Sequence, residues 1–107
     1  MNTHIRAKDI TLSDFTKQHI ENAISAFSKY HLDITGVDVN ITKEKNEIHV
    51  EFNIHIAHSN PVVINQMDAV LDAAIDLAID RAKNALSKLH DKVKHKDRTS
   101  IKDIENI

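Results

Sequence analysis

The chain has 107 residues, enough for one small domain with a single hydrophobic core. It contains no cysteine and one glycine, which excludes disulfide frameworks, cysteine nucleophiles and the glycine-rich loops that cradle phosphates. The formal net charge is −2, but residues 1–80 carry six Lys or Arg against twelve Asp or Glu, whereas residues 81–102 carry eight against two.

The first 30 residues show no secretory signal, and no apolar run has the length of a membrane helix. We therefore expect a cytoplasmic protein. Apolar and polar residues alternate over residues 3–8, which predicts a first strand. Thr11 or Ser13 can cap the helix that follows, and Ile10 is placed to pack against Phe15. This helix should end near residue 30, and its apolar face recurs at steps of three and four: Thr16, Ile20, Ala23, Ile24 and Phe27.

The middle of the chain alternates strictly between apolar and polar residues. Residues 37–42 and 48–56 predict two antiparallel strands joined by a turn at Lys45-Asn46, with one buried face and one face toward water. Ser59-Asn60-Pro61 indicates a second turn, which leads into a short strand at residues 62–64.

A long helix is expected from about Asp68 to Lys96. Asp68, Asp72, Asp76 and Asp80 fall on the flank opposite its cations. Its apolar stripe needs a sheet or a helix to cover it: Leu71, Ala74, Ile75, Ala78, Ala82, Ala85, Leu86, Leu89 and Val93. Residues 97–107 lack a convincing period, so we expect a domain over residues 1–96 and a mobile tail over residues 97–107.

The predicted order of elements is β-α-β-β-β-α. A crossover through the first helix should make the first two strands parallel, and the next two connections should be hairpins. We predict a single α+β domain in which two helices pack on one face of a four-stranded sheet, similar to a double-stranded RNA-binding domain.

Basic residues of the last helix fall along one side of its apolar stripe, which we call the basic edge: Arg81, Lys88, Lys92, His95 and Lys96. Cations held on one rigid surface can displace several counterions from a phosphate backbone at once. The alternative is a solvated face whose cations interact favourably with the C-terminal end of the helix dipole. The positive charge of residues 81–102 favours phosphate binding.

The few aromatic residues indicate how a nucleic acid would be recognised. Phe15 or Phe27, together with Phe52, should lie in the core, which leaves Tyr30 as the one exposed ring. The chain therefore offers few aromatic rings on which single-stranded bases could stack, and contacts with the phosphates of folded RNA are favoured.

Metal binding and catalysis have little support in the sequence. His49, Glu51 and His55 share one strand face, but they would need a neighbouring strand to complete a site, so a solvated sheet face is preferred. We expect no metal and no other cofactor. No serine on a glycine-bounded turn and no isolated acidic pair indicates catalysis, so we expect no enzymatic activity.

The last helix resembles that of the ribosome hibernation promoting factor family, also called ribosome-associated inhibitor A or sigma-54 modulation protein. Residues 72–81 match the family's Ala-Ala-Ile-Asp segment and the basic residue that follows a second Asp one turn later. Residues 86–94 match its Leu-x-Lys-x-x-Asp-Lys-x-Lys ending. Leu12-Ser13-Asp14 also matches the family's apolar residue, helix cap and acid. The resemblance extends over about residues 1–96.

The resemblance implies a short-form, non-catalytic factor that binds the small ribosomal subunit in the channel between head and body. There it would contact ribosomal RNA, overlap the messenger RNA and transfer RNA sites, and inhibit translation under stress or in stationary phase. A separate ribosome modulation factor is a further implied partner, and we expect a monomer away from the ribosome. The implied RNA-binding residues are Lys17, Arg81, Lys88, Lys92 and Lys94, extended by His95 and Lys96. The assignment of strand faces adds Arg6 and Lys8.

The sequence also departs from the family pattern. Ala7 stands where the family commonly has glycine, and Asn84 is neutral where the family has a basic residue. These departures lower the expected affinity for RNA or shift its dependence on salt and pH. The second hypothesis is a double-stranded-RNA-binding-like or protein-interaction module unrelated to ribosomes.

Overall fold

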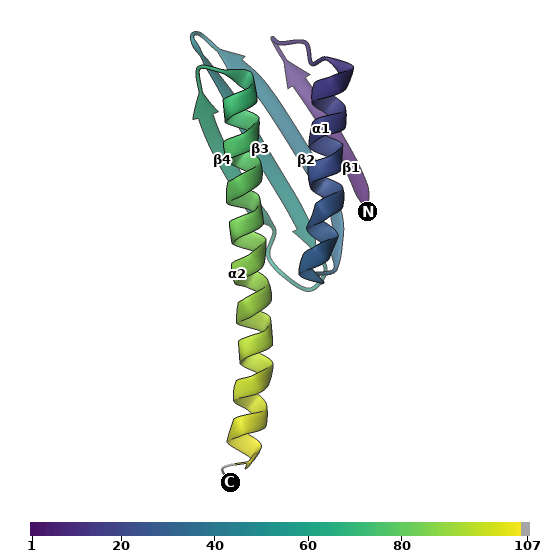
Figure 1. Ribbon diagram of the computed structural model, residues 1–107, viewed down its shortest axis with the longest axis vertical. Helices are drawn as coiled ribbons and strands as arrows, with labels where there is room; N and C mark the ends of the chain where they lie inside the picture. The colour runs from purple at the N-terminus through teal and green to yellow at the C-terminus, as the bar shows by residue number, and fades with distance from the viewer. Residues whose placement is uncertain (106–107) are drawn as a thin grey trace.

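A computed structural model describes the backbone of residues 1–105 and the side chains of residues 1–92. The order of elements confirms the predicted β-α-β-β-β-α arrangement (Figure 1). The elements are β1 (Asn2–Lys8), α1 (Asp14–Ser25), the 3-10 helix η1 (Ala26–Tyr30), β2 (Ile34–Glu44), β3 (Glu47–Ile56), β4 (Val62–Asp68) and α2 (Leu71–Glu105).

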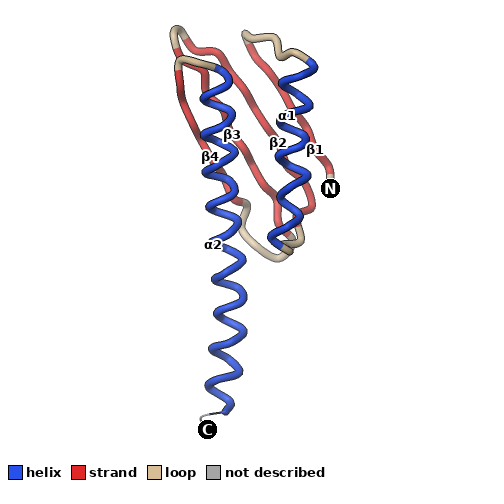
Figure 2. The backbone as a smooth tube through the Cα atoms, viewed as in Figure 1, coloured by secondary structure: helices blue, strands red, loops and turns tan. Residues whose placement is uncertain are grey.

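The four strands form one sheet in the order β1-β2-β3-β4. As predicted, β1 is parallel to β2, and the two remaining pairs are antiparallel. Lys45 has a φ of 51° in the two-residue turn between β2 and β3, a left-handed conformation that suits the twist of a tight hairpin. Both helices cover the same face of the sheet, so the other face is open to solvent (Figure 2).

The core lies between this sheet and the two helices. Alternation buries one set of side chains on β2 and β3, including Val39 and Phe52, both 0% exposed. The helices cover them with Ile20, Ile24, Ala74, Ile75, Ala78, Ile79, Ala82 and Leu86. No polar or charged residue among residues 1–92 is buried. The charged groups of the described residues are therefore confined to the surface, whereas the Asn53 Oδ1 is buried without a hydrogen-bond partner.

The first helix begins at the predicted cap. The Ser13 Oγ accepts a hydrogen bond from the Thr16 backbone N–H at 3.1 Å, and the helical segment ends through η1 at His31, which has a φ of 54°. The predicted packing of Phe15 against Ile10 is wrong, because Phe15 is 83% exposed. Phe15 lies about 140° around the helix from the buried Ile20, so its ring faces away from the sheet.

The exposed ring is therefore Phe15, whereas Phe27 is fully buried and Tyr30 is half-buried against the core. The prediction that Tyr30 would be the exposed ring was wrong. Leu12 and Phe27 occupy the apolar positions of this region instead, since both are buried.

The boundary between β4 and α2 also differs from the prediction. β4 extends to Asp68 because β3 is long enough to pair with it as far as Ile48. Asp68 therefore lies on the sheet, where its Oδ1 accepts a hydrogen bond from the Val70 backbone N–H at 2.9 Å, and α2 begins at Leu71.

At its other end, α2 continues past Lys96 to Glu105. The only Pro and the only Gly of the chain lie well before this segment, so no helix-breaking residue stops it at Lys96. The mobility of residues 97–107, and with it the boundary at residue 96, stays a prediction.

Candidate nucleic-acid interface

The described part of the basic edge consists of three exposed side chains on α2. Arg81, Lys88 and Lys92 are separated by seven and four residues, a spacing that places them on the same side of the helix. Lys94, His95 and Lys96 belong to the same helix, but their side chains lie outside the described residues. The geometry of the basic edge therefore rests on Arg81, Lys88 and Lys92.

Arg81 also attaches α2 to the sheet. Its Nη1 donates to the backbone carbonyl oxygen of Asn65 and to the Oε1 of Gln66, the latter at 3.1 Å. A guanidinium has further N–H donors, so an exposed arginine can hold β4 and still offer hydrogen bonds to a phosphate. The basic edge therefore lies beside β4 at Arg81.

The basic residues of β1 lie elsewhere. Arg6 is in register with Asn40 of β2, and Lys8 is in register with Thr42. Because paired residues share a face, Arg6 and Lys8 lie with these polar residues on the open face. β1 and β4 are opposite edges of the sheet, so the structure does not bring Arg6 and Lys8 together with the basic edge.

Lys17 occupies a third location. It is exposed on α1, and it is two residues from His19, which places the two side chains on different sides of the helix. His19 faces α2, since its Nε2 lies 2.8 Å from the Asp76 Oδ1. The predicted RNA-binding residues with described side chains are therefore divided among three surfaces.

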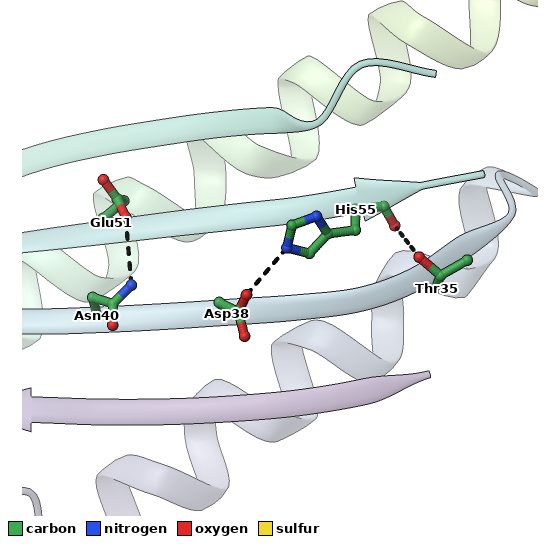
Figure 3. Close-up of polar contacts among 5 residues, drawn as sticks. All are labelled: Thr35, Asp38, Asn40, Glu51 and His55. Carbon is green, nitrogen blue, oxygen red and sulfur yellow. Dashed lines mark hydrogen bonds and ion pairs between the residues drawn. The ribbon is translucent and has the colours of Figure 1, made fainter. Parts of the chain in front are cut away.

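Polar contacts between β2 and β3 occupy the open face of the sheet (Figure 3). The His55 Nε2 lies 3.1 Å from the Asp38 Oδ2, and the Asn40 Nδ2 donates to the Glu51 Oε1 at 3.4 Å. Thr35 adds a hydrogen bond from its Oγ1 to the backbone carbonyl oxygen of His55 at 3.3 Å. These contacts tie the two central strands together across the face that the helices leave open.

The residues considered for metal binding each contact a different neighbour. The His49 Nε2 lies 2.8 Å from the Asn65 Oδ1, whereas Glu51 and His55 contact residues of β2. Among the residues with described side chains, no group of three or more His, Asp or Glu is placed to hold a metal ion. The arrangement fits a solvated sheet face.

Sequence reasoning missed an apolar component beside the basic edge. Leu77 of α2 is 43% exposed and lies one turn before Arg81. Its signal in the sequence is weak, because a single apolar residue beside a polar one fits either a core position or a surface position. The surface around Arg81 therefore combines a cation with an apolar side chain.

Comparisons with known proteins agree on the fold. The crystal structure of the N-terminal domain of Protein Y from Thermus thermophilus has a TM-score of 0.71 at 21% sequence identity, covering 83% of this chain and 99% of that one. A ribosomal subunit interface protein from Coxiella burnetii also has a TM-score of 0.71, at 14% identity, covering 83% of this chain and 97% of that one. A comparison with curated proteins found no significant match.

Within the described residues, no helix has a stretch long and apolar enough to cross a membrane. The sequence profile of the family described as Sigma 54 modulation protein / S30EA ribosomal protein matches residues 3–94. This match runs from β1 into the part of α2 that carries the basic edge. The chain therefore belongs to the Sigma 54 modulation protein / S30EA ribosomal protein family.

Proposed function

We propose that this protein inhibits translation by binding the small ribosomal subunit in the decoding channel, where it blocks the messenger RNA and transfer RNA sites under stress or in stationary phase. The observation that carries the proposal is the family match over residues 3–94. The name of the similar Coxiella burnetii protein, a ribosomal subunit interface protein, supports a ribosomal partner. Such a partner also supports a cytoplasmic location.

The distribution of polar groups supports binding rather than catalysis. No charged residue among residues 1–92 is buried, so the described charged groups are available for surface contacts. Arg81, Lys88 and Lys92 supply cations on one rigid helix, which suits contacts with ribosomal RNA phosphates. We extend this surface to His95 and Lys96, and the family resemblance adds Lys94 as a further RNA contact. Arg6, Lys8 and Lys17 would make separate contacts if the channel surrounds the domain.

Co-sedimentation with purified small subunits through a sucrose gradient tests this proposal. The protein should migrate with the subunit at moderate salt, and added messenger RNA or initiator transfer RNA should displace it. An absence of co-migration would overturn ribosome binding. Co-migration that neither RNA displaces would place the binding site outside the decoding channel. Repeating the gradients on whole ribosomes with ribosome modulation factor measures whether this protein promotes or opposes their pairing.

The second candidate function is binding of duplex RNA without a ribosome. The basic edge favours it, since cations along one helix can contact the phosphates across a groove of an RNA duplex. A competition experiment separates the two functions. An unrelated RNA duplex and the subunit's own RNA are added separately as competitors. If both release the protein from the subunit at similar concentrations, the general RNA-binding function is supported.

A further inference from the structure

A cavity lies between α1 and α2, on the side of the helices away from the sheet. It has a volume of about 220 Å³ and is lined by Phe15, Thr16, His19, Asp72, Ile75 and Asp76. Ile75 is 1% exposed, whereas Phe15 is 83% exposed. The cavity therefore combines an apolar floor, an exposed aromatic ring and two carboxylates.

The cavity continues along the two helices as a shallow groove. His19 and Asp76 line both parts, and the second part extends to Asp80 and Lys83. Asp72, Asp76 and Asp80 are exposed and four residues apart, so they line the same side of α2. We call this surface, from Phe15 to Asp80, the acidic groove. Lys83 is the lysine among the lining residues, and it lies at the end of the groove that is remote from Phe15.

The contact between His19 and Asp76 does not close the groove. The His19 Nε2 and the Asp76 Oδ1 are 2.8 Å apart, but the two side chains are 51% and 63% exposed. Exposed pairs of this kind contribute little free energy, so a ligand can replace the contact. The Asp76 carboxylate is therefore available to a stronger hydrogen-bond donor.

The chemistry of the acidic groove selects its ligand. Its three aspartates repel phosphates, which disfavours RNA on this surface. An arginine side chain fits both of its features, because a guanidinium stacks on an aromatic ring and donates two parallel hydrogen bonds to a carboxylate. We propose that the acidic groove docks an arginine-bearing segment of a basic protein, with a guanidinium over Phe15 and paired with Asp72 or Asp76.

This docking surface is separate from the basic edge. Asp72 and Arg81 are nine residues apart on α2, which places them about half a turn out of phase. The acidic groove faces α1, whereas Arg81 faces β4. RNA and a basic protein segment can therefore bind this domain at the same time, and the docking proposal does not depend on the proposed function.

The test measures binding of a synthetic probe to the full chain. The probe is a blocked ten-residue peptide of alternating arginine and alanine, and its control carries citrulline in place of arginine. The double variant Asp72→Asn with Asp76→Asn should raise the Kd of the probe about tenfold, since two carboxylate contacts are lost. Phe15→Ser should raise it about threefold. The matched control, Glu44→Gln with Glu47→Gln, removes the same charge from the β2–β3 hairpin and should leave the Kd within about twofold.

Backbone amide shifts in NMR spectra locate the bound probe, which should shift residues of α1 and of the first turns of α2. All four acids and Phe15 are exposed, so thermal melts should confirm that each variant folds. Equal loss of affinity in the two double variants would show non-specific charge attraction and overturn the proposal. Equal binding of the citrulline peptide, or no binding of either peptide at millimolar concentration, would also overturn it. Salt-sensitive self-association that both the probe and the Asp72/Asp76 variant abolish would identify a second copy of the chain as the occupant instead.

Discussion

The guanidinium of Arg81 on α2 reaches β4, where its Nη1 lies 3.1 Å from the Oε1 of Gln66 and also contacts the backbone carbonyl oxygen of Asn65. A residue of the basic edge is thus also part of the contact between helix and sheet. It links this side of α2 to the edge strand of the sheet. Lys88, seven residues later on the same edge, is exposed.

Replacement of Arg81 by leucine separates these two roles. We expect Arg81→Leu to lower the free energy of unfolding by about 1 kcal/mol, because hydrogen bonds to β4 are lost. Lys88→Leu is the matched control and should change it by less than about 0.5 kcal/mol. Urea denaturation measures both values. Equal stabilities of the two variants would show that the contacts of Arg81 with β4 contribute nothing to folding.

The basic edge is tested by reversing two of its charges. Lys88→Glu with Lys92→Glu should weaken binding to the small subunit at least about tenfold, because two cations that neutralise phosphates become repulsive. Both side chains are exposed, so the fold should be retained. Lys43→Glu with Lys45→Glu makes the same change in net charge on the β2–β3 hairpin. Binding that falls equally in both double variants would mean that net charge alone controls the affinity.

The core packing of α2 is tested by one substitution at two positions. Leu86 is 0% exposed, so Leu86→Ala should lower the free energy of unfolding by about 2–5 kcal/mol. Leu77 is 43% exposed on the same helix, and Leu77→Ala should cost less than about 1 kcal/mol. A similar cost at both positions, measured by urea denaturation, would contradict the orientation of α2 on the sheet.

Binding of RNA should strengthen as the pH falls from about 7.5 to 6, because histidines gain positive charge in this range and attract phosphates. His95 is the histidine that the sequence assigns to the basic edge, seven residues after Lys88, so His95→Gln should reduce the increase. His55→Gln, on the open face beside Asp38, is the control and should leave the increase largely intact. Fluorescence anisotropy of labelled RNA at several pH values measures this. A flat profile would show that the histidines lie away from the RNA.

Local patterns in the sequence predicted most of the elements. Alternation over residues 37–42 and 48–56 identified β2 and β3, because side chains of a strand point to opposite faces in turn. The spacing of Ile20 and Ile24 likewise identified the buried side of α1. The family resemblance in the last helix agreed with the profile match over residues 3–94.

Boundaries and surfaces depended on contacts between distant segments. The end of β4 at Asp68 follows from pairing with β3, which no local pattern records. Phe15 is apolar, as core residues are, but the way α1 packs on the sheet turns its ring outward. The sequence could not show this, because helical periodicity specifies the relative positions of side chains but not the position of the sheet.

The charge distribution of the chain likewise depends partly on the sequence and partly on the tertiary structure. The sequence by itself determined that residues 81–102 are basic and that aspartates recur every four residues before them. Only the tertiary structure decided that Arg81 faces β4, that Asp76 faces His19 of α1, and that Arg6 and Lys8 lie at the opposite edge of the sheet. The physical reason is that helical periodicity sets the angles between side chains of one helix, whereas packing on the sheet sets what each side of that helix meets.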